Sequence, residues 1–176
     1  PGESYLLLLP PAEAALPAAQ DIPLAVLFED AHLIVVDKPA GLVVHPAPGN
    51  PDSTLVNALL AHSDDWAGIR GVLKPGIVHR LDKNTSGLMV TAKHDQSCVG
   101  LQNQFRDRMV TKVYRALVWG TPHPKRGRIN QPIARNPRDR IKMAVVSGGK
   151  TAISDYEVLE ELGKEHAYVE VLLHTG

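Results

Sequence analysis

The sequence predicts an α+β fold in which a mixed, largely antiparallel sheet is flanked by helices. Three observations predict it. Short apolar runs separated by Gly, Pro, Asn and Asp recur along most of the 176 residues, as is typical of strands. Apolar side chains at helical spacing occur in only two segments. These segments do not alternate with the strands in the regular βαβ order of a parallel sheet.

The apolar runs define the expected strands. In order along the chain they are Leu33 to Val36, Leu42 to Val44, Leu88 to Ala92, Val113 to Trp119, Met143 to Val146, Ala152 to Leu159 and Ala167 to Leu173. In the last run, apolar residues at 167, 169, 171 and 173 alternate with His166, Tyr168 and Glu170. This alternation predicts a sheet with one wetter face.

Two helices interrupt the strands. Asp52 or Ser53 can cap the first, in which Leu55 and Leu59 share a face. Asp95 can cap the second, whose apolar side chains recur at four-residue steps, at Leu101, Phe105 and Met109.

Composition limits the possible classes of protein. No apolar run approaches the roughly 20 residues of a membrane span, so we expect no membrane protein. Cys98 is the single cysteine, which excludes a disulfide within the chain and a cysteine-based zinc site. We therefore expect a cytoplasmic protein.

Residues 10–21 are small, Pro-rich and aperiodic, which is typical of a linker. Residues 1–9 are then interpreted as the tail of a preceding module.

The net charge of zero hides an uneven distribution. Residues 1–65 carry a net charge of −8, residues 66–150 carry +13 and residues 151–176 carry −5. Within the middle segment, Arg106 to Lys142 holds eleven basic residues, most of them arginines, against Asp107 and Asp139. Such a density favours binding along a phosphate backbone, although a solvated, arginine-rich loop would look the same. We expect Arg135, Arg138 and Arg140 to contact such a backbone.

The residues most capable of chemistry lie in one polar loop, at positions 76–90, between two apolar runs. If the chain is extended here, Arg80 and Asp82 point one way and His79 and Leu81 the other. The loop lacks the arrangement of a kinase, because the Asp and Leu of the kinase catalytic loop are transposed and no Gly-rich loop is present. No nucleophile elbow or zinc motif occurs either, so we expect no metal.

Asp82 is the candidate catalytic group. A carboxylate can act as a nucleophile when it is oriented beside a cation. It can equally cap the turn, or form an ion pair with Arg80 or Lys83, and the residues alone leave these alternatives open.

Residues 79–93, HRLDKNTSGLMVTAK, resemble the signature of the RluA/RluD family of RNA pseudouridine synthases. Residues 36–46 resemble that family's first motif and residues 112–116, KVYRA, its K-x-Y-x-A strand. The similarity covers 22–176, which we expect to be the catalytic domain. Residues 49–52 and 56–60 look closest to the RluD branch, which modifies large-subunit (23S) ribosomal RNA.

The resemblance implies a cofactor-free isomerisation in which a uridine in RNA is cut from its ribose, turned and rejoined through carbon 5. It implies that Asp82 is the essential carboxylate, which either attacks the nucleotide or removes a sugar proton. Tyr114 would lie against the uracil, and Arg80 would occupy the space that the flipped base leaves. Base flipping costs a few kcal/mol, and an aromatic face recovers about 1–3 kcal/mol.

Two departures from the family pattern accompany the resemblance. Family members continue past Thr175-Gly176 into R-T-H-Q-I-R, and the first Arg of that motif pairs with the catalytic Asp. We therefore expect the catalytic domain to be incomplete at its C-terminus. We also expect this piece alone to have little activity. Residues 1–9 are the expected remnant of an N-terminal RNA-binding domain. We expect the synthase to be a monomer. Two alternatives to a synthase remain: an inactive RNA-binding module of the same fold, and a hydrolase that releases uracil.

Overall fold

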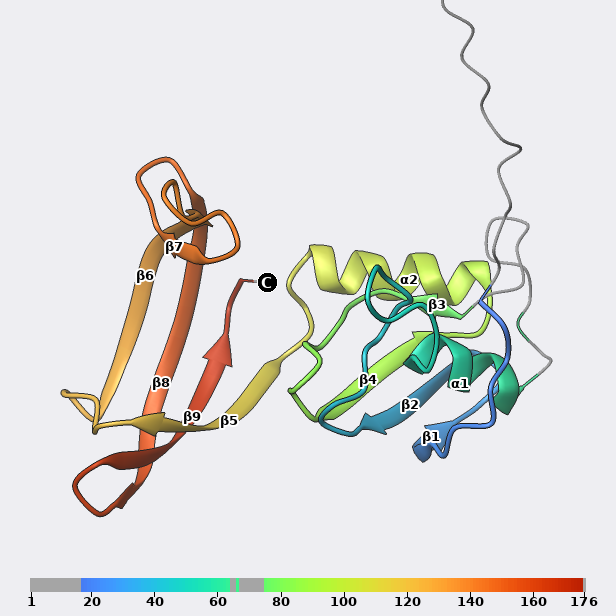
Figure 1. Cartoon of the computed structure of the whole chain (residues 1–176), viewed down its shortest axis with the longest axis horizontal. Coiled ribbons are helices and arrows are strands. Elements are labelled where there is room, and N and C mark those ends of the chain that lie inside the picture. The colour runs from blue at the N-terminus through green and yellow to red at the C-terminus, as the bar shows by residue number, and fades with distance from the viewer. Residues whose placement is uncertain (1–16, 64–65, 67–74, 176) are drawn as a thin grey trace, which may run out of the picture. The chain divides into compact units, whose positions relative to one another are not determined.

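The computed structural model describes residues 17–63, 66 and 75–175 (Figure 1). The chain divides into two compact units, residues 1–102 and 103–176, and each is described by itself. The predicted remnant at 1–9 and most of the predicted linker lie outside the described residues. Residues 17–21 contain no helix or strand.

The first unit is built on a four-stranded antiparallel sheet. Its strands lie in the order β1 (Ala25–Glu29), β2 (Leu33–Lys38), β4 (Gly87–Ala92) and β3 (Gly76–Ile77). Two helices accompany the sheet, α1 (Leu55–His62) and α2 (Asp95–Arg106), the second of which crosses the boundary between the units.

The second unit contains a five-stranded antiparallel sheet. Its order is β5 (Lys112–Trp119), β9 (His166–Leu173), β8 (Lys150–Leu162), β6 (Arg126–Arg135) and β7 (Met143–Val145). The α+β class and the antiparallel pairing are thus confirmed, with the strands shared between two sheets.

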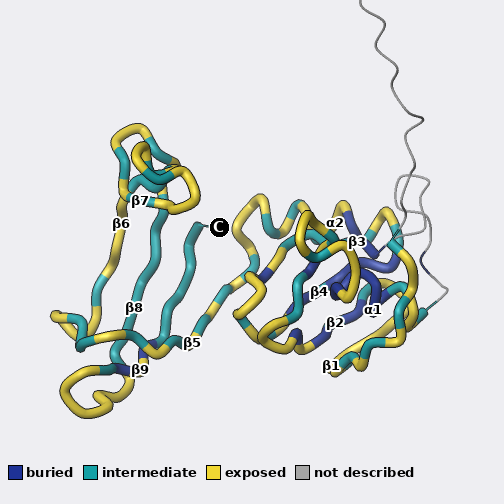
Figure 2. The backbone as a smooth tube through the Cα atoms, in the orientation of Figure 1, coloured by how far each residue is buried: buried dark blue, intermediate teal, exposed yellow. Residues whose placement is uncertain are grey.

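The buried core is concentrated in the first unit, where Figure 2 shows most of the buried backbone. Ile34, Val36 and Met89 present one buried face of the sheet, since residues two apart in a strand share a face. On the opposite face Ala92 packs with Cys98 of α2. In the described part of the second unit, the buried hydrophobic residues are Ala167 and Val169. The predicted alternation in β9 is therefore confirmed over residues 166–169, whereas residues 170–173 are all half-buried.

The segment Leu42 to Val44 is not a strand, contrary to the sequence prediction. It makes only one isolated bridge, from Val43 to Thr54. The carbonyls of Val43 and Val44 instead accept hydrogen bonds from the N–H groups of Leu55 and Val56, at 2.8 and 3.1 Å. These N–H groups belong to the first turn of α1, where no partner within the helix exists. The segment therefore caps the helix.

The predicted start of α1 was wrong by one or two residues, whereas α2 begins at Asp95, the residue predicted to cap it. Thr54, and not Asp52 or Ser53, is the N-cap of α1, where it forms a reciprocal capping box with Asn57. In α2 the ring Nδ1 of His94 accepts from the N–H of Ser97. The helix ends at Arg106, so Met109, at 72% exposed, lies beyond it.

Strands β1, β3 and β6 were missed. β6 carries the sequence RGRINQPIAR, in which arginines and polar residues replace the apolar alternation that usually indicates a strand. Pairing with β8 along eight residues holds it in the sheet.

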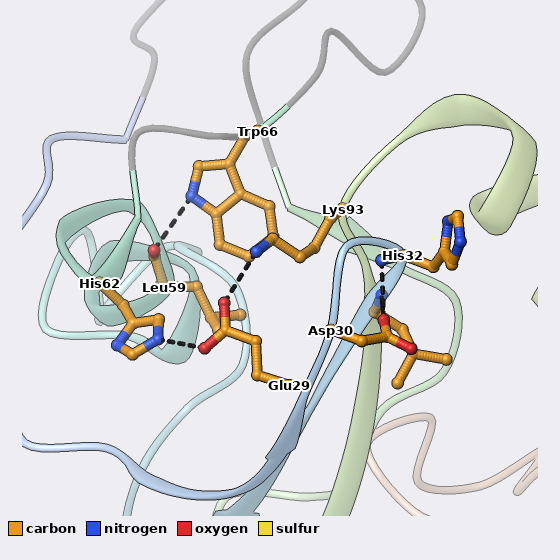
Figure 3. A network of polar contacts seen from close by, with 8 residues as sticks. Glu29, Asp30, His32, Leu59, His62, Trp66 and Lys93 are labelled. Carbon is orange, nitrogen blue, oxygen red and sulfur yellow. Dashed lines mark hydrogen bonds and ion pairs between the residues drawn. The ribbon is translucent and has the colours of Figure 1, made fainter.

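An ion-pair network joins β1 to α1 and to the residue that follows β4 (Figure 3). Glu29 accepts hydrogen bonds from Nζ of Lys93 and contacts Nε2 of His62, each at 2.8 Å. Beside this network, the indole N–H of the buried Trp66 donates to the carbonyl of Leu59 at 3.1 Å. The hydrogen bond from Lys93, followed by that from His62, holds the pKa of Glu29 below its usual value of 4.5.

We expect Glu29→Gln to make the free energy of unfolding depend less on pH under acidic conditions. Because the pKa of Glu29 is lower in the folded state than in the unfolded state, its contribution is complete above pH 4.5 and is lost as the pH falls through the folded value. Urea unfolding between pH 3 and 7 should show a loss of roughly 1 kcal/mol at neutral pH in the variant. The exposed Glu165→Gln is the control, and an equal loss at every pH in the Glu29 variant would contradict the prediction.

Candidate functional site

The candidate site centres on the chain between β3 and β4. Leu81 is buried and His79 is half-buried, whereas Arg80 and Asp82 are exposed. The predicted alternation is therefore confirmed, and Arg80 and Asp82 share the solvent side of this segment.

A tight turn follows Asp82. The N–H of Thr85 donates to the carbonyl of Asp82 at 3.1 Å, and Gly87 enters β4 with φ of 126°, which a residue with a side chain adopts poorly. Before the turn, Nε2 of His79 accepts from the N–H of Val90 at 3.1 Å. His79 thus ties the approach to Asp82 onto β4.

Lys38 is the residue that holds the site together. Its side chain is fully buried, and its Nζ donates to the carbonyls of Pro39, Leu42 and Lys83 at 3.0, 2.9 and 3.2 Å. The N–H of Gly41 donates to the same Lys83 carbonyl at 2.7 Å. The buried ammonium therefore joins the loop after β2 to the turn that carries Asp82.

The charges around this junction influence one another. Burial lowers the pKa of Lys38, and the negative charge of Asp82 opposes that shift. The pKa of His45 is also lowered, first by partial loss of hydration and then by the positive charge of Arg80. Nζ of Lys83 lies 3.4 Å from Oδ1 of Asn50. Residues 38–50 and 79–85 thus form one polar site around Asp82.

The structural alternatives for Asp82 can be compared with these contacts. The group that closes the turn is the Asp82 backbone carbonyl. Among the described residues, the Asp82 carboxylate forms no ion pair with Arg80 or Lys83. An exposed carboxylate on a fixed turn can meet an external group.

Tyr114 belongs to β5 in the second unit and is half-buried. It faces Val171 across the β5–β9 pair. Asp82 and Arg80 lie in the same exposed loop of the first unit, whereas Tyr114 belongs to the second unit.

Much of the predicted basic surface is paired with carboxylates from β8 and β9. Arg115 pairs with Glu170 at 2.7 Å, Lys125 with Glu161 at 2.6 Å and Arg126 with Glu157. Arg128 makes a bidentate pair with Asp155, whose pKa falls far below its usual value because of Arg128 and then His174. These pairs cancel much of the charge that the sequence count attributes to the segment.

The hairpin between β6 and β7 retains its positive charge. Arg138 and Arg140 are exposed and form no ion pair with a described residue. Nη1 of Arg135 donates to the carbonyls of Arg140 and Ile141, at 3.2 and 3.3 Å. Of the three arginines predicted to contact RNA, Arg135 therefore shapes the loop and the other two extend from it.

A cavity of about 500 Å³ lies beside the site and shares Lys38 and Pro39 with it, while Pro23, Leu24, Ala25, Asp37 and Ser86 complete its lining. In the described part of the chain, no group of three His, Cys, Asp or Glu side chains could hold a metal ion. No helix among the described residues is long and apolar enough to cross a membrane.

Comparisons with known proteins show which family the chain is similar to. Residues 32–176 match the family model described as RNA pseudouridylate synthase. The chain is 52% identical over 160 residues to ribosomal large subunit pseudouridine synthase D of Zymomonas mobilis, covering 89% of this chain and 50% of that protein. It is 50% identical over 158 residues to the protein of the same name from Pseudomonas aeruginosa, covering 90% of this chain and 48% of the relative. The chain thus spans about half the length of these relatives.

A solved structure shows the same fold. Human RNA Pseudouridylate Synthase Domain Containing 4 matches with a TM-score of 0.64 and 30% identity, over 86% of this chain and 59% of the human chain.

Proposed function

The chain belongs to the RNA pseudouridylate synthase family, and from that premise we propose that its protein converts uridines of large-subunit ribosomal RNA to pseudouridine. The names of the relatives from Zymomonas and Pseudomonas support the choice of RNA. Ribosomal RNA as substrate also supports a cytoplasmic location.

The Asp82 carboxylate is the observation that carries the proposal. It is exposed, it is free of ion pairs with described residues, and the Lys38 contacts hold the turn that bears it. A catalytic carboxylate needs orientation and an accessible approach, because at neutral pH an aspartate is usually ionised already.

In the reaction, the bond from ribose to uracil N1 breaks and a new bond from ribose to carbon 5 forms. Carbon 5 loses a proton and N1 gains one, so the overall change is an isomerisation that consumes no co-reactant. Asp82 either attacks the nucleotide or acts as the base that removes a proton from its sugar. Its fixed position aligns it with a flipped nucleotide.

Arg80 and Tyr114 are proposed to hold that nucleotide. Arg80 shares the exposed side of the loop with Asp82, which suits a side chain that fills the gap left in the RNA stack. Tyr114 offers an aromatic face for stacking on uracil.

Release of tritium from RNA labelled at carbon 5 of uridine tests the activity in the full-length protein. A synthase releases tritium and leaves pseudouridine in the RNA. RNA binding with no release would identify an inactive binding module, and free uracil in the products would identify a hydrolase. Either of these results would overturn the proposal.

We expect the double variant Arg138→Ala, Arg140→Ala to weaken RNA binding and to flatten its salt dependence. Removal of one arginine–phosphate ion pair should reduce the slope of log K against log salt by roughly 0.7 to 0.9. Filter binding at several salt concentrations measures the slope. Arg126→Ala is the matched control, since that guanidinium is paired with Glu157 and should not contribute. Equal slopes in the double variant and the wild type would show that the hairpin arginines face away from RNA.

A further inference from the structure

The hairpin tip between β6 and β7 is held in one shape by its own hydrogen bonds. Oδ1 of Asn136 accepts from the N–H groups of Arg138 and Asp139, at 2.8 and 3.2 Å. Oδ1 of Asp139 accepts from the N–H of Ile141 at 3.2 Å. The N–H of Asn136 donates to the carbonyl of Lys142 at 2.9 Å, which closes the loop. Since Arg135 also binds two carbonyls of the loop, the tip loses little conformational entropy when it binds a partner.

This ordered loop presents an apolar side chain to solvent. Ile141 is 88% exposed, the highest value among the large hydrophobic residues that the structure describes. The loop therefore holds an isoleucine outward, where a partner could cover it.

Positive charges surround that side chain. Arg140 and Lys142 are its neighbours in sequence, and Arg138 lies in the same loop. Asp139 is the single acid among residues 135–142 and pairs with Lys142 at 3.3 Å. On the strands of the second unit, by contrast, Arg115, Arg126 and Arg128 are matched by carboxylates.

We infer that the hairpin tip inserts Ile141 between RNA bases while Arg138 and Arg140 bind the flanking phosphates. This inference rests on the proposed function for its choice of partner. Apolar side chains act as wedges at base steps in proteins that distort nucleic acid, and they depend on neighbouring cations to anchor the backbone. A loop held by its own hydrogen bonds, with an exposed isoleucine at its tip and two exposed arginines beside it, provides both parts.

The test uses the full-length protein with an unmodified large-subunit ribosomal RNA transcript. Ile141→Ala should weaken binding about tenfold, with an unchanged salt slope, because it removes apolar burial and leaves every phosphate ion pair in place. Ile141→Leu should restore the affinity. Ile129→Ala, which shortens an isoleucine on β6 that is 53% exposed, is the matched control and should bind as the wild type does.

A second readout reports the insertion itself. Acylation of RNA 2′-hydroxyl groups should reveal nucleotides that become reactive in the wild-type complex and remain unreactive in the Ile141→Ala complex. Unchanged affinity and acylation in Ile141→Ala would overturn the inference while leaving the proposed function intact. It would also be overturned if Ile141 were needed for binding to phosphatidylglycerol vesicles and had no effect on RNA. If tritium release failed but RNA binding still depended on Ile141, only the proposed function would fall.

Discussion

Replacement of Asp82 by Asn should abolish pseudouridine formation while leaving the protein folded and bound to RNA. The change removes the charge and the basicity of one exposed side chain and keeps its size. Loss of an essential nucleophile or base lowers the rate by at least about 10³-fold. Tritium release from uridine-labelled RNA measures the rate, and filter binding of the same RNA measures affinity.

Asp21→Asn is the matched control, because it makes the same substitution at an exposed position before β1. It should retain the wild-type rate. Retention of more than a tenth of the rate in Asp82→Asn would contradict the catalytic assignment. A parallel loss of RNA affinity and rate would instead assign Asp82 to binding.

Replacement of Lys38 by Met should produce the largest loss of stability. Methionine fills a similar volume but donates no hydrogen bond, which leaves the carbonyls of Pro39 and Leu42 without the partner that Lys38 provides. Both hydrogen bonds are part-buried and have a charged donor, and loss of such a bond costs about 1.5–3 kcal/mol, so the free energy of unfolding should fall by roughly 2–5 kcal/mol. Urea denaturation measures this change, and Lys164→Met, at an exposed turn, should have almost no effect.

The same variant separates stabilisation from positioning. Nζ of Lys38 also binds the carbonyl of Lys83, the residue after Asp82. At a temperature where the variant is fully folded, kcat should therefore still fall, because the Asp82 turn is no longer clamped. A folded Lys38→Met protein with wild-type kcat would show that Lys38 contributes to stability alone.

The local chemistry of the loop could be predicted from sequence. Alternation along an extended chain placed Arg80 and Asp82 on the same side, and the structure shows that this side is exposed while Leu81 is buried. The apolar runs located β4, β5 and β9 closely because their side chains pack on a sheet face. These features depend on neighbouring residues, which is why a linear pattern reveals them.

The contacts that join distant segments could not be predicted in the same way. Lys38 and the Lys83 carbonyl are 45 positions apart, and a lysine in a sequence is usually interpreted as a solvated charge. Similarly, the acids that neutralise Arg126 and Arg128 lie on β8, on the far side of a long hairpin. A charge count along the chain therefore overstated the basic surface. Lys38 is the last residue of the apolar strand β2 and precedes Pro39, and this position was the available signal for burial.

Mapping of pseudouridines in large-subunit ribosomal RNA tests the central claim most directly. The RNA is taken from cells that lack the gene and from the same cells carrying either the wild-type gene or Asp82→Asn. Specific pseudouridines should be absent without the gene, return with the wild type and stay absent with Asp82→Asn. An identical set of pseudouridines in all three, or their return with Asp82→Asn, would contradict it.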